Sequence, residues 1–270
     1  MRSTVSRPLT SNMETFIQNV LEIISKYWPS LLLGVRTTLI VSLSGTILGL
    51  LLGLLVGGLK AVKLDYTASK LSRFFKKLYD ILAYIYITIF RGTPMMVQAV
   101  FIYYALLNVL HWNALTAAIT VISVNTGAYM AEIIRSGIQA VDVGQTEAAR
   151  SLGMSNTQTM IFVVLPQAIK NAFPAIGNEL IVNIKDSSVL MIISITELMF
   201  QSKSIAGSTF LFTETYFVEA MIYLILTSIA ALILNGIEKK MNKNSTKFSI
   251  PQSVTDPIST KNIRMKKEGQ

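Results

Sequence analysis

The stretch TTLIVSLSGTILGLLLGLLVGGL, residues 37–59, decides the fold class, because it runs for 23 residues without a charged side chain. A helix of about 20 apolar residues is long enough to cross the roughly 30 Å hydrocarbon core of a bilayer. Within this stretch Gly45, Gly49, Gly53 and Gly57 recur in steps of four and therefore share one stripe of the helix. We expect a neighbouring helix to approach that stripe closely, unless the glycines are simply tolerated there.

Four further apolar segments predict additional crossings, at about residues 78–110, 115–134, 168–195 and 217–237. The segment 78–110 is too long for one straight crossing at about 1.5 Å per residue. The run Arg91-Gly92-Thr93-Pro94 offers a break within it, since proline cannot continue a helical hydrogen-bond ladder. The fold class is therefore an all-α integral membrane protein with about five transmembrane helices.

The composition excludes several kinds of function. The chain of 270 residues is 51% hydrophobic and only 14% charged, well below the charge content of an ordinary soluble domain. It has no cysteine, which removes disulfides and thiolate metal sites, and its single histidine leaves little for zinc, so no metal or cofactor is expected. The basic residues flank apolar blocks without interleaved aromatic side chains, which argues against nucleic-acid binding.

The distribution of basic residues predicts the orientation. Residues 60–77 hold six lysines and arginines, and the residues after 237 hold eight. Both stretches belong inside by the positive-inside rule, so the amino terminus would lie outside and the carboxyl terminus in the cytoplasm. The basic residues near the amino terminus argue mildly the other way.

The two ends of the chain differ from its middle. In the amino-terminal segment, residues 1–33, apolar side chains recur at helical spacing up to Pro29 (Phe16, Val20, Ile23, Ile24 and Tyr27). This pattern predicts an interfacial helix. Residues 238–270 are polar and basic and are expected to form a cytoplasmic tail.

The stretch QAVDVGQTEAARSLGMSNTQTMIFVVLPQ, residues 139–167, is too polar to span the membrane, but its capping residues predict ordered helices. Asp142 with Gln145 has the spacing of a capping box, and the helix that it starts would run to Leu152. Gly153 is placed to end that helix in the left-handed conformation. The expected element is a helix that stops at a glycine turn.

A second helix is expected to follow that turn. Ser155 with Gln158 repeats the capping device, and Leu165-Pro166 is expected to end the helix, because proline disfavours helical geometry in the residue before it. Such a rigid element, held by two spans, could pass displacement without losing it in loop flexibility. The alternative is an amphipathic interfacial hairpin.

The run Glu147-Ala148-Ala149, followed by Gly153 and Leu165-Pro166, resembles the EAA loop of permease subunits of ATP-binding-cassette importers. Three further runs are similar to the branch of that family that carries histidine, glutamine, glutamate, arginine and opines: Phe90-Arg91-Gly92-Thr93-Pro94, Asn125-Thr126-Gly127-Ala128-Tyr129 and Ala131-Glu132-Ile133-Ile134-Arg135. The resemblance covers residues 34–237, which would form a transmembrane permease domain in a bacterial cell membrane. The chain is thus expected to form the pathway of an importer for polar amino acids.

The resemblance implies partners and a coupling element. The coupling residues would be Glu147, Ala148, Ala149, Gly153 and Met154, docking on an ATPase subunit. A second permease copy, identical or related, and an extracytoplasmic solute-binding protein would complete the machine. The chain has no phosphate-binding loop, so ATP would be bound and hydrolysed by the partner, and no enzyme activity is expected of this chain.

Charged side chains within a span are costly and are expected to face a cavity or a partner. Glu179 and Asp186 are seven residues apart and therefore share one stripe. Two carboxylates there suit the amine or guanidinium of a passing amino acid, with Lys185 pointing elsewhere. The alternative is that one of them pairs with Lys185 or Arg135.

Three more residues complete the predicted solute site. Arg91, beside the helix break, could hold the solute carboxylate, or it could brace the next span through Glu132. Asn125 offers uncharged hydrogen bonds, and Ser187 lies in a run, residues 185–188, that is close to the family pattern. Glu132 and Arg135 are expected near the inner surface, as a salt bridge or gate.

Two other functions remain open at the level of the sequence. A channel or gradient-driven transporter could use Glu179, Asp186 and Arg91 as an ion relay, although the EAA-like loop argues against it. A permease of the same machinery could instead carry another amine-bearing solute, since two carboxylates accept any amine.

Overall fold

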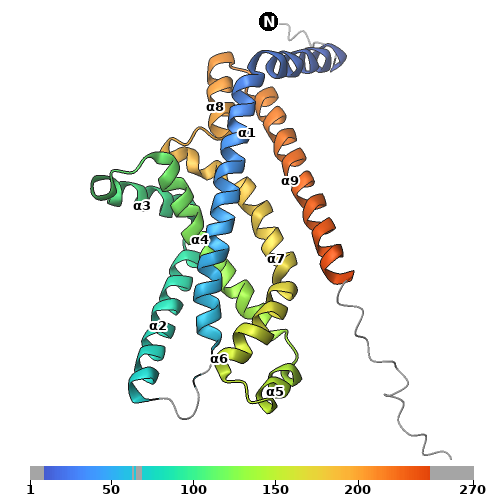
Figure 1. The fold of residues 1–270 in the computed structure, drawn as a ribbon. Helices are drawn as coiled ribbons and strands as arrows, with labels where there is room; N and C mark the ends of the chain where they lie inside the picture. Colours follow the sequence, from blue (N-terminus) through green and yellow to red (C-terminus); the bar gives the residue numbers. More distant parts are fainter. Residues whose placement is uncertain (1–8, 63, 65–68, 244–270) are drawn as a thin grey trace, which may run out of the picture.

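The computed structural model describes residues 9–62, 64 and 69–243, and this part of the chain is helical without a strand (Figure 1). Four helices in it are long and apolar enough to cross a membrane, and a bent pair adds a fifth possible span. The predicted fold class, with about five transmembrane helices, is confirmed. The end of the basic tail, from residue 244, and residues 1–8 lie outside the described residues.

Helix α1 (Leu9–Ala61) joins the predicted interfacial helix and the first span into one element with Pro29 inside it. Figure 1 shows its first turns lying across one end of the molecule and the remainder running down the centre. An internal proline is a common cause of such a bend. The first turns pack on α9 (Phe212–Lys243), where the rings of Phe16 and Phe217 meet edge to face at 5.5 Å.

The glycine stripe of α1 lies directly against α4 (Ala114–Gln139). A Cβ atom added to Gly53 would come within 2.3 Å of Met130 Cβ, and one added to Gly57 would come within 2.5 Å of the Ala131 carbonyl oxygen. Gly45 and Gly49 are blocked in the same way by α4 side chains. The expected close approach of a neighbouring helix is confirmed.

The predicted break in the second apolar segment is confirmed. Helix α2 (Lys70–Gly92) ends at the break, and α3 (Met95–Leu110) begins after Pro94 at an angle of 114° to it. Pro94 precedes the first turn of α3, a position where its missing N–H costs nothing. The pair returns the chain to the start of α4, where the Asn113 side chain accepts a hydrogen bond from Thr116 N at 2.8 Å.

The chain then forms a helical hairpin at the end of the molecule opposite to the first turns of α1. Its parts are α5 (Val143–Ser151), α6 (Asn156–Thr159) and a π-helical turn, η1 (Met160–Val164), which leads into α7 (Leu165–Asp186). The prediction that the second helix ends at Leu165-Pro166 is wrong. Proline in the first turn of α7 is tolerated, and the wider π turn before it keeps the chain helical.

The last elements return to the first end of the molecule and back. A 3-10 turn, η2 (Ser187–Ile193), follows α7, and α8 (Leu198–Thr209) packs beside the upper part of α1 (Figure 1). Ile23, Leu31, Leu198, Ile205 and Val218 form one buried apolar cluster there. Helix α9 then runs from that end alongside α7 and stops short of the hairpin.

Candidate functional site

The break between α2 and α3 is held by a network of amide hydrogen bonds. Gln98 Nε2 donates to the carbonyl oxygens of Phe90 at 3.0 Å and Thr93 at 2.9 Å, and to Thr93 Oγ1 at 2.7 Å. Asn125 Nδ2, from α4, donates to Gln98 Oε1 at 2.8 Å. These bonds satisfy carbonyl groups that the interrupted helix leaves free. Asn125, predicted as a solute contact, thus has a positioning role at the break.

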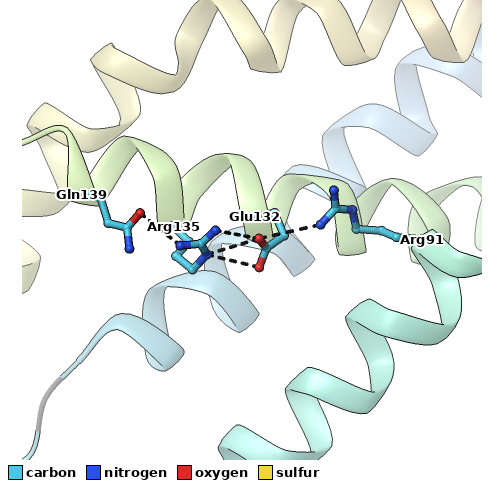
Figure 2. A network of polar contacts seen from close by, with 4 residues as sticks. All are labelled: Arg91, Glu132, Arg135 and Gln139. Carbon is cyan, nitrogen blue, oxygen red and sulfur yellow. Dashed lines mark hydrogen bonds and ion pairs between the residues drawn. The ribbon is translucent and has the colours of Figure 1, made fainter.

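A ladder of polar side chains runs along α4 from this break toward the hairpin, as Figure 2 shows. Arg91 Nη1 lies 3.7 Å from Glu132 Oε2, and Arg135 Nη2 donates to the same oxygen at 2.8 Å. Arg135 Nη1 then donates to Gln139 Oε1 at 3.0 Å. Arg91 therefore braces α4 through Glu132, which is one of the two roles expected for it.

The ladder is only partly buried. The side chains of Arg91 and Arg135 are 42% and 37% exposed, and that of Glu132 is 23% exposed. The Arg91 guanidinium also lies 5.4 Å from the ring centre of Tyr129. Ion pairs at this exposure contribute little to stability but can rearrange, which fits the predicted salt bridge or gate.

The two α7 carboxylates differ in their surroundings. Glu179 is half-buried, and Asp186, at the last residue of α7, is exposed. The charges of Asp186 and Arg91 both reach Glu179, so the three predicted charged residues share one region. Within the described chain, no Lys or Arg nitrogen lies within 4 Å of either carboxylate, and Arg135 pairs with Glu132 instead. That these residues bind solute stays a prediction.

Ser187 follows Asp186 in the chain but is turned into the interior. Its side chain is fully buried, and Oγ donates to the Ile184 carbonyl oxygen at 2.9 Å. A neighbouring cluster that the sequence analysis missed joins three helices: Asn183 Nδ2 donates to Thr46 Oγ1 at 2.8 Å, and Thr126 Oγ1 donates to Asn183 Oδ1 at 3.1 Å. An asparagine inside an apolar span was the available signal.

The hairpin carries the predicted coupling residues. Gly153 has φ +83°, the left-handed conformation expected, and its N–H donates to the Arg150 carbonyl oxygen at 2.9 Å. The Ser155–Gln158 capping box is confirmed. The first box is half right: the Asp142 side chain caps Gly144 N at 2.6 Å, while the Gln145 side chain accepts from Gln167.

The face that the hairpin turns outward is partly apolar. Ala149 is buried and Met154 partly buried, whereas Glu147 and Ala148 are exposed. Val143 and Leu152 are 69% and 84% exposed. Exposed apolar side chains beside a short rigid helix are typical of a docking element.

A buried carboxylate near the opposite end of the molecule, Glu197, was also missed. Glu197 is fully buried, and its carboxylate accepts from Met199 N at 2.8 Å, from Phe200 N at 2.7 Å and from Tyr223 Oη at 3.1 Å. Burial raises the pKa of Glu197 to about 7 despite these donors. The sequence signal was a single charge in the otherwise uncharged run 187–202.

Comparison with known proteins now adds to the geometry. The family described as binding-protein-dependent transport system inner membrane component matches residues 66–243. The chain belongs to this family. The permease is thus a multi-pass inner-membrane subunit of an importer, and membership implies a solute-binding protein and an ATPase subunit as partners.

Two curated relatives and one solved structure cover most of the permease. It is 35% identical to the glutamine transport system permease protein of Escherichia coli (strain K12) over 223 residues, which are 80% of this chain and 96% of that protein. It is 34% identical to the arginine transport system permease protein of Bacillus subtilis (strain 168), covering 80% and 94%. A crystal structure of an amino acid ABC transporter with histidines matches with a TM-score of 0.69 at 38% identity, covering 80% and 96%.

A more distant structure shares the fold. The MetNI methionine ABC transporter in an inward-facing conformation matches the permease with a TM-score of 0.67 at 21% identity. Family membership decides between the two mechanisms left open by the sequence: the permease is part of an ATP-driven importer, not a channel or gradient-driven transporter.

Proposed function

We propose that the permease forms the pathway of an importer for polar amino acids. The observation that carries the proposal is the position of Glu179, which lies within electrostatic reach of both the Asp186 carboxylate and the Arg91 guanidinium. An amino acid carries one group of each sign, so this region complements both ends of it. Relatives named for glutamine and arginine transport point the same way.

In this proposal Glu179 and Asp186 receive the amine or guanidinium of the solute, and Arg91 receives its carboxylate. Arg91 can do so because its contact with Glu132 is long, at 3.7 Å, and leaves its other nitrogens available. Asn125 keeps the break rigid and Ser187 lies behind the pathway wall, and each reaches the solute only through a rearrangement of the hydrogen bonds described above. Another amine-bearing solute is the alternative for the same site.

The hairpin is proposed as the coupling element. Glu147, Ala148, Ala149, Gly153 and Met154 would form its contact with the ATPase subunit, supported by the exposed Val143 and Leu152 beside them. The glycine turn fixes the angle between α5 and the helix that leads into α7. Displacement of α5 by the ATPase would therefore be passed to α7, which carries Glu179 and Asp186. ATP would be bound by the partner, and the permease itself would hold no cofactor.

The proposed orientation follows from the basic residues. The hairpin and the start of α2 share one end of the molecule, toward which the last turns of α9 point (Figure 1), and this end is assigned to the cytoplasm. The amino-terminal turns of α1 would then lie at the outer membrane surface, with Ile17, Leu21 and Trp28 exposed toward lipid. A single chain supplies half of a pathway wall, so two permease copies would enclose the pathway.

ATP-dependent uptake into vesicles tests the solute site. The permease would be reconstituted with its co-purifying ATPase and binding protein, and uptake of labelled glutamine, glutamate, histidine and arginine compared. We expect E179Q/D186N to lose at least about ten-fold in uptake of its preferred amino acid, since each lost charge-assisted bond costs about 1.5 kcal/mol or more. E14Q, an exposed carboxylate on the first turns of α1, serves as the matched control. Unchanged uptake in the double variant would move the site to other residues.

A further inference from the structure

A cavity at the hairpin end of the molecule lies outside the proposed solute site. Its volume is about 550 Å³, and it is enclosed by the last turns of α1 and α4, by α5 and by the segment from α6 into the π turn. Much of its wall is apolar, including Ile138, Val141, Met160 and Val164. A space of this size is within the range of small-molecule sites. The cavity separates the proposed coupling helix from the membrane helices.

One polar group in the wall lacks a partner. Thr159 is 2% exposed, and its Oγ1 has no hydrogen-bond partner among the residues that the structure describes. A threonine in a helix usually donates to the carbonyl four residues earlier, but the hydroxyl of Thr159 makes no such bond to Ser155. An unpaired buried hydroxyl costs about 1 to 3 kcal/mol, so a ligand that accepts its hydrogen bond would be favoured.

The cavity is also positively charged. Lys60 and Arg135 both line it, no acidic residue is among the lining residues that the structure describes, and Glu132 is shared between Arg135 and Arg91. Three cations therefore surround one carboxylate. The charge of Lys60 reaches Glu132, but within the described chain no carboxylate oxygen lies within 4 Å of Lys60 Nζ. An anion would satisfy both Lys60 and the Thr159 hydroxyl.

The depth of the cavity identifies the source of that anion. Lys60 directly follows the uncharged span of residues 37–59, and α4 ends at Gln139 beside it, so the cavity lies where the hydrocarbon core gives way to headgroups. We propose that the cavity binds an anionic phospholipid of the inner leaflet. Its phosphate contacts Lys60 and Thr159, and its glycerol and upper acyl carbons lie on Met160 and Val164. A free inorganic anion would leave this apolar wall uncovered.

The position of the cavity gives the lipid a consequence for transport. The cavity is bordered by α5 on one side and by the π turn on the other, and π turns are common at functional sites. A bound lipid fills the space between the coupling helix α5 and the membrane helices. It therefore limits the movement of α5 relative to these helices, so that displacement by the ATPase is passed on to α7. The inference rests on the proposed orientation, in which this end faces the cytoplasm.

Lipid retention tests the proposal. The intact importer, stripped of lipid in detergent, would be incubated with phosphatidylglycerol or with phosphatidylcholine of the same acyl chains, and the bound lipid counted by native mass spectrometry. We expect one tightly held phosphatidylglycerol per permease and a K60Q affinity about five-fold lower, as for one lost cation at a membrane surface. T159V, which keeps the shape of the side chain, is expected to lower affinity about ten-fold by removing one hydrogen bond to a charged group.

K239Q is the matched control, because Lys239 is an exposed basic residue of α9 outside the cavity. Equal losses in K239Q and K60Q, or equal retention of the two lipids, would overturn the proposal. Displacement of the lipid by an equal concentration of glycerol 3-phosphate would also overturn it, because the site would then take a soluble anion. Uptake of amino acids by the wild-type importer in the same preparation tests the proposed function separately. Uptake without lipid selectivity would refute the lipid site alone.

Discussion

Two faces of α4 are built on opposite principles. The face toward α1 meets a stripe of glycines, with no room for a single added methyl group. Another face carries the ladder of Arg91, Glu132, Arg135 and Gln139, whose charged side chains remain partly exposed and paired at distances from 2.8 to 3.7 Å (Figure 2). The first face is held by close packing of small residues, and the second carries ion pairs.

The difference separates what holds the permease together from what can move. Close packing in lipid depends on small residues that admit a neighbouring backbone, and such contacts cannot shift without creating a clash or a void. Partly exposed ion pairs exchange partners at little cost. We therefore expect substitutions in the packed face to change stability and substitutions in the ladder to change transport.

The largest expected effect is the loss of stability in G57A. The added Cβ would lie 2.5 Å from the Ala131 carbonyl oxygen, a backbone atom that cannot rotate away, so we expect a loss of about 3 kcal/mol, as for overpacked cores. G58A is the matched control on the same helix, because nothing lies within 4 Å of a Cβ added there. The free energy of unfolding in mixed micelles measures both. Equal values for the two variants would show that the stripe is not a packing seam.

A second prediction concerns the pH dependence of stability that the fully buried Glu197 side chain causes. The Glu197 pKa is raised by burial from 4.5 to about 7, with Glu219 and Tyr223 of α9 facing its carboxylate. Because the folded protein then holds a proton that the unfolded chain has lost, stability is full below pH 4.5 and falls as the pH rises to about 7. The fall attributable to this group is about 2 to 3 kcal/mol.

E197Q tests this dependence, since an amide cannot ionise, while its single oxygen can still accept from one of the two N–H groups of Met199 and Phe200. The variant is expected to lose the part of the decline in unfolding free energy between pH 4.5 and 7 that Glu197 causes. E14Q, at an exposed position, should keep the wild-type decline. A decline of the same size in E197Q would mean that other groups set the pH dependence.

How far the sequence predicts these regions depends on whether the signal is local. The glycine spacing of four and the run at residues 91–94 are local patterns, and both the seam and the helix break followed from them. The left-handed turn at Gly153 was predictable for the same reason. The helix end expected at Leu165-Pro166 was wrong because a π turn changes the hydrogen-bond register, which residue types alone do not reveal.

Contacts between distant segments were harder to predict. The sequence shows Glu197 as an isolated charge in an apolar run. It does not show that Tyr223, from another helix, donates a hydrogen bond to it. The bond between Asn125 and Gln98 was not predicted, because it depends on how α3 folds back after the break. For Arg91 the sequence offered two roles, and only the packing of α2 on α4 brings it to Glu132.

A third, smaller effect distinguishes stiffness from stability at the hairpin. G153A forces a side chain into a left-handed conformation at a cost of about 1 to 2 kcal/mol, although no atom obstructs the added Cβ. The turn is expected to relax, so that ATP hydrolysis continues while uptake per ATP falls several-fold. G236A, on the exposed face of α9 with open space around it, should leave both rates unchanged. Normal uptake per ATP in G153A would argue against the hairpin as the coupling element.

The smallest expected change in stability is that of E132Q, and it is the sharpest test of the ladder. Removing the carboxylate leaves the Arg91 and Arg135 guanidiniums without their shared partner, yet both are exposed enough for water to compensate, so we expect less than about 1 kcal/mol. Uptake is expected to fall about ten-fold, because the ladder sets the position of Arg91 at the solute site, and this fall corresponds to a transport barrier higher by about 1.4 kcal/mol. D80N is the matched control, because Asp80 forms a partly exposed pair with Lys76 at 2.5 Å on α2, away from the ladder. A stability loss in E132Q as large as that in G57A would erase the distinction between the two faces of α4. Unchanged uptake would reduce the ladder to a surface ion pair.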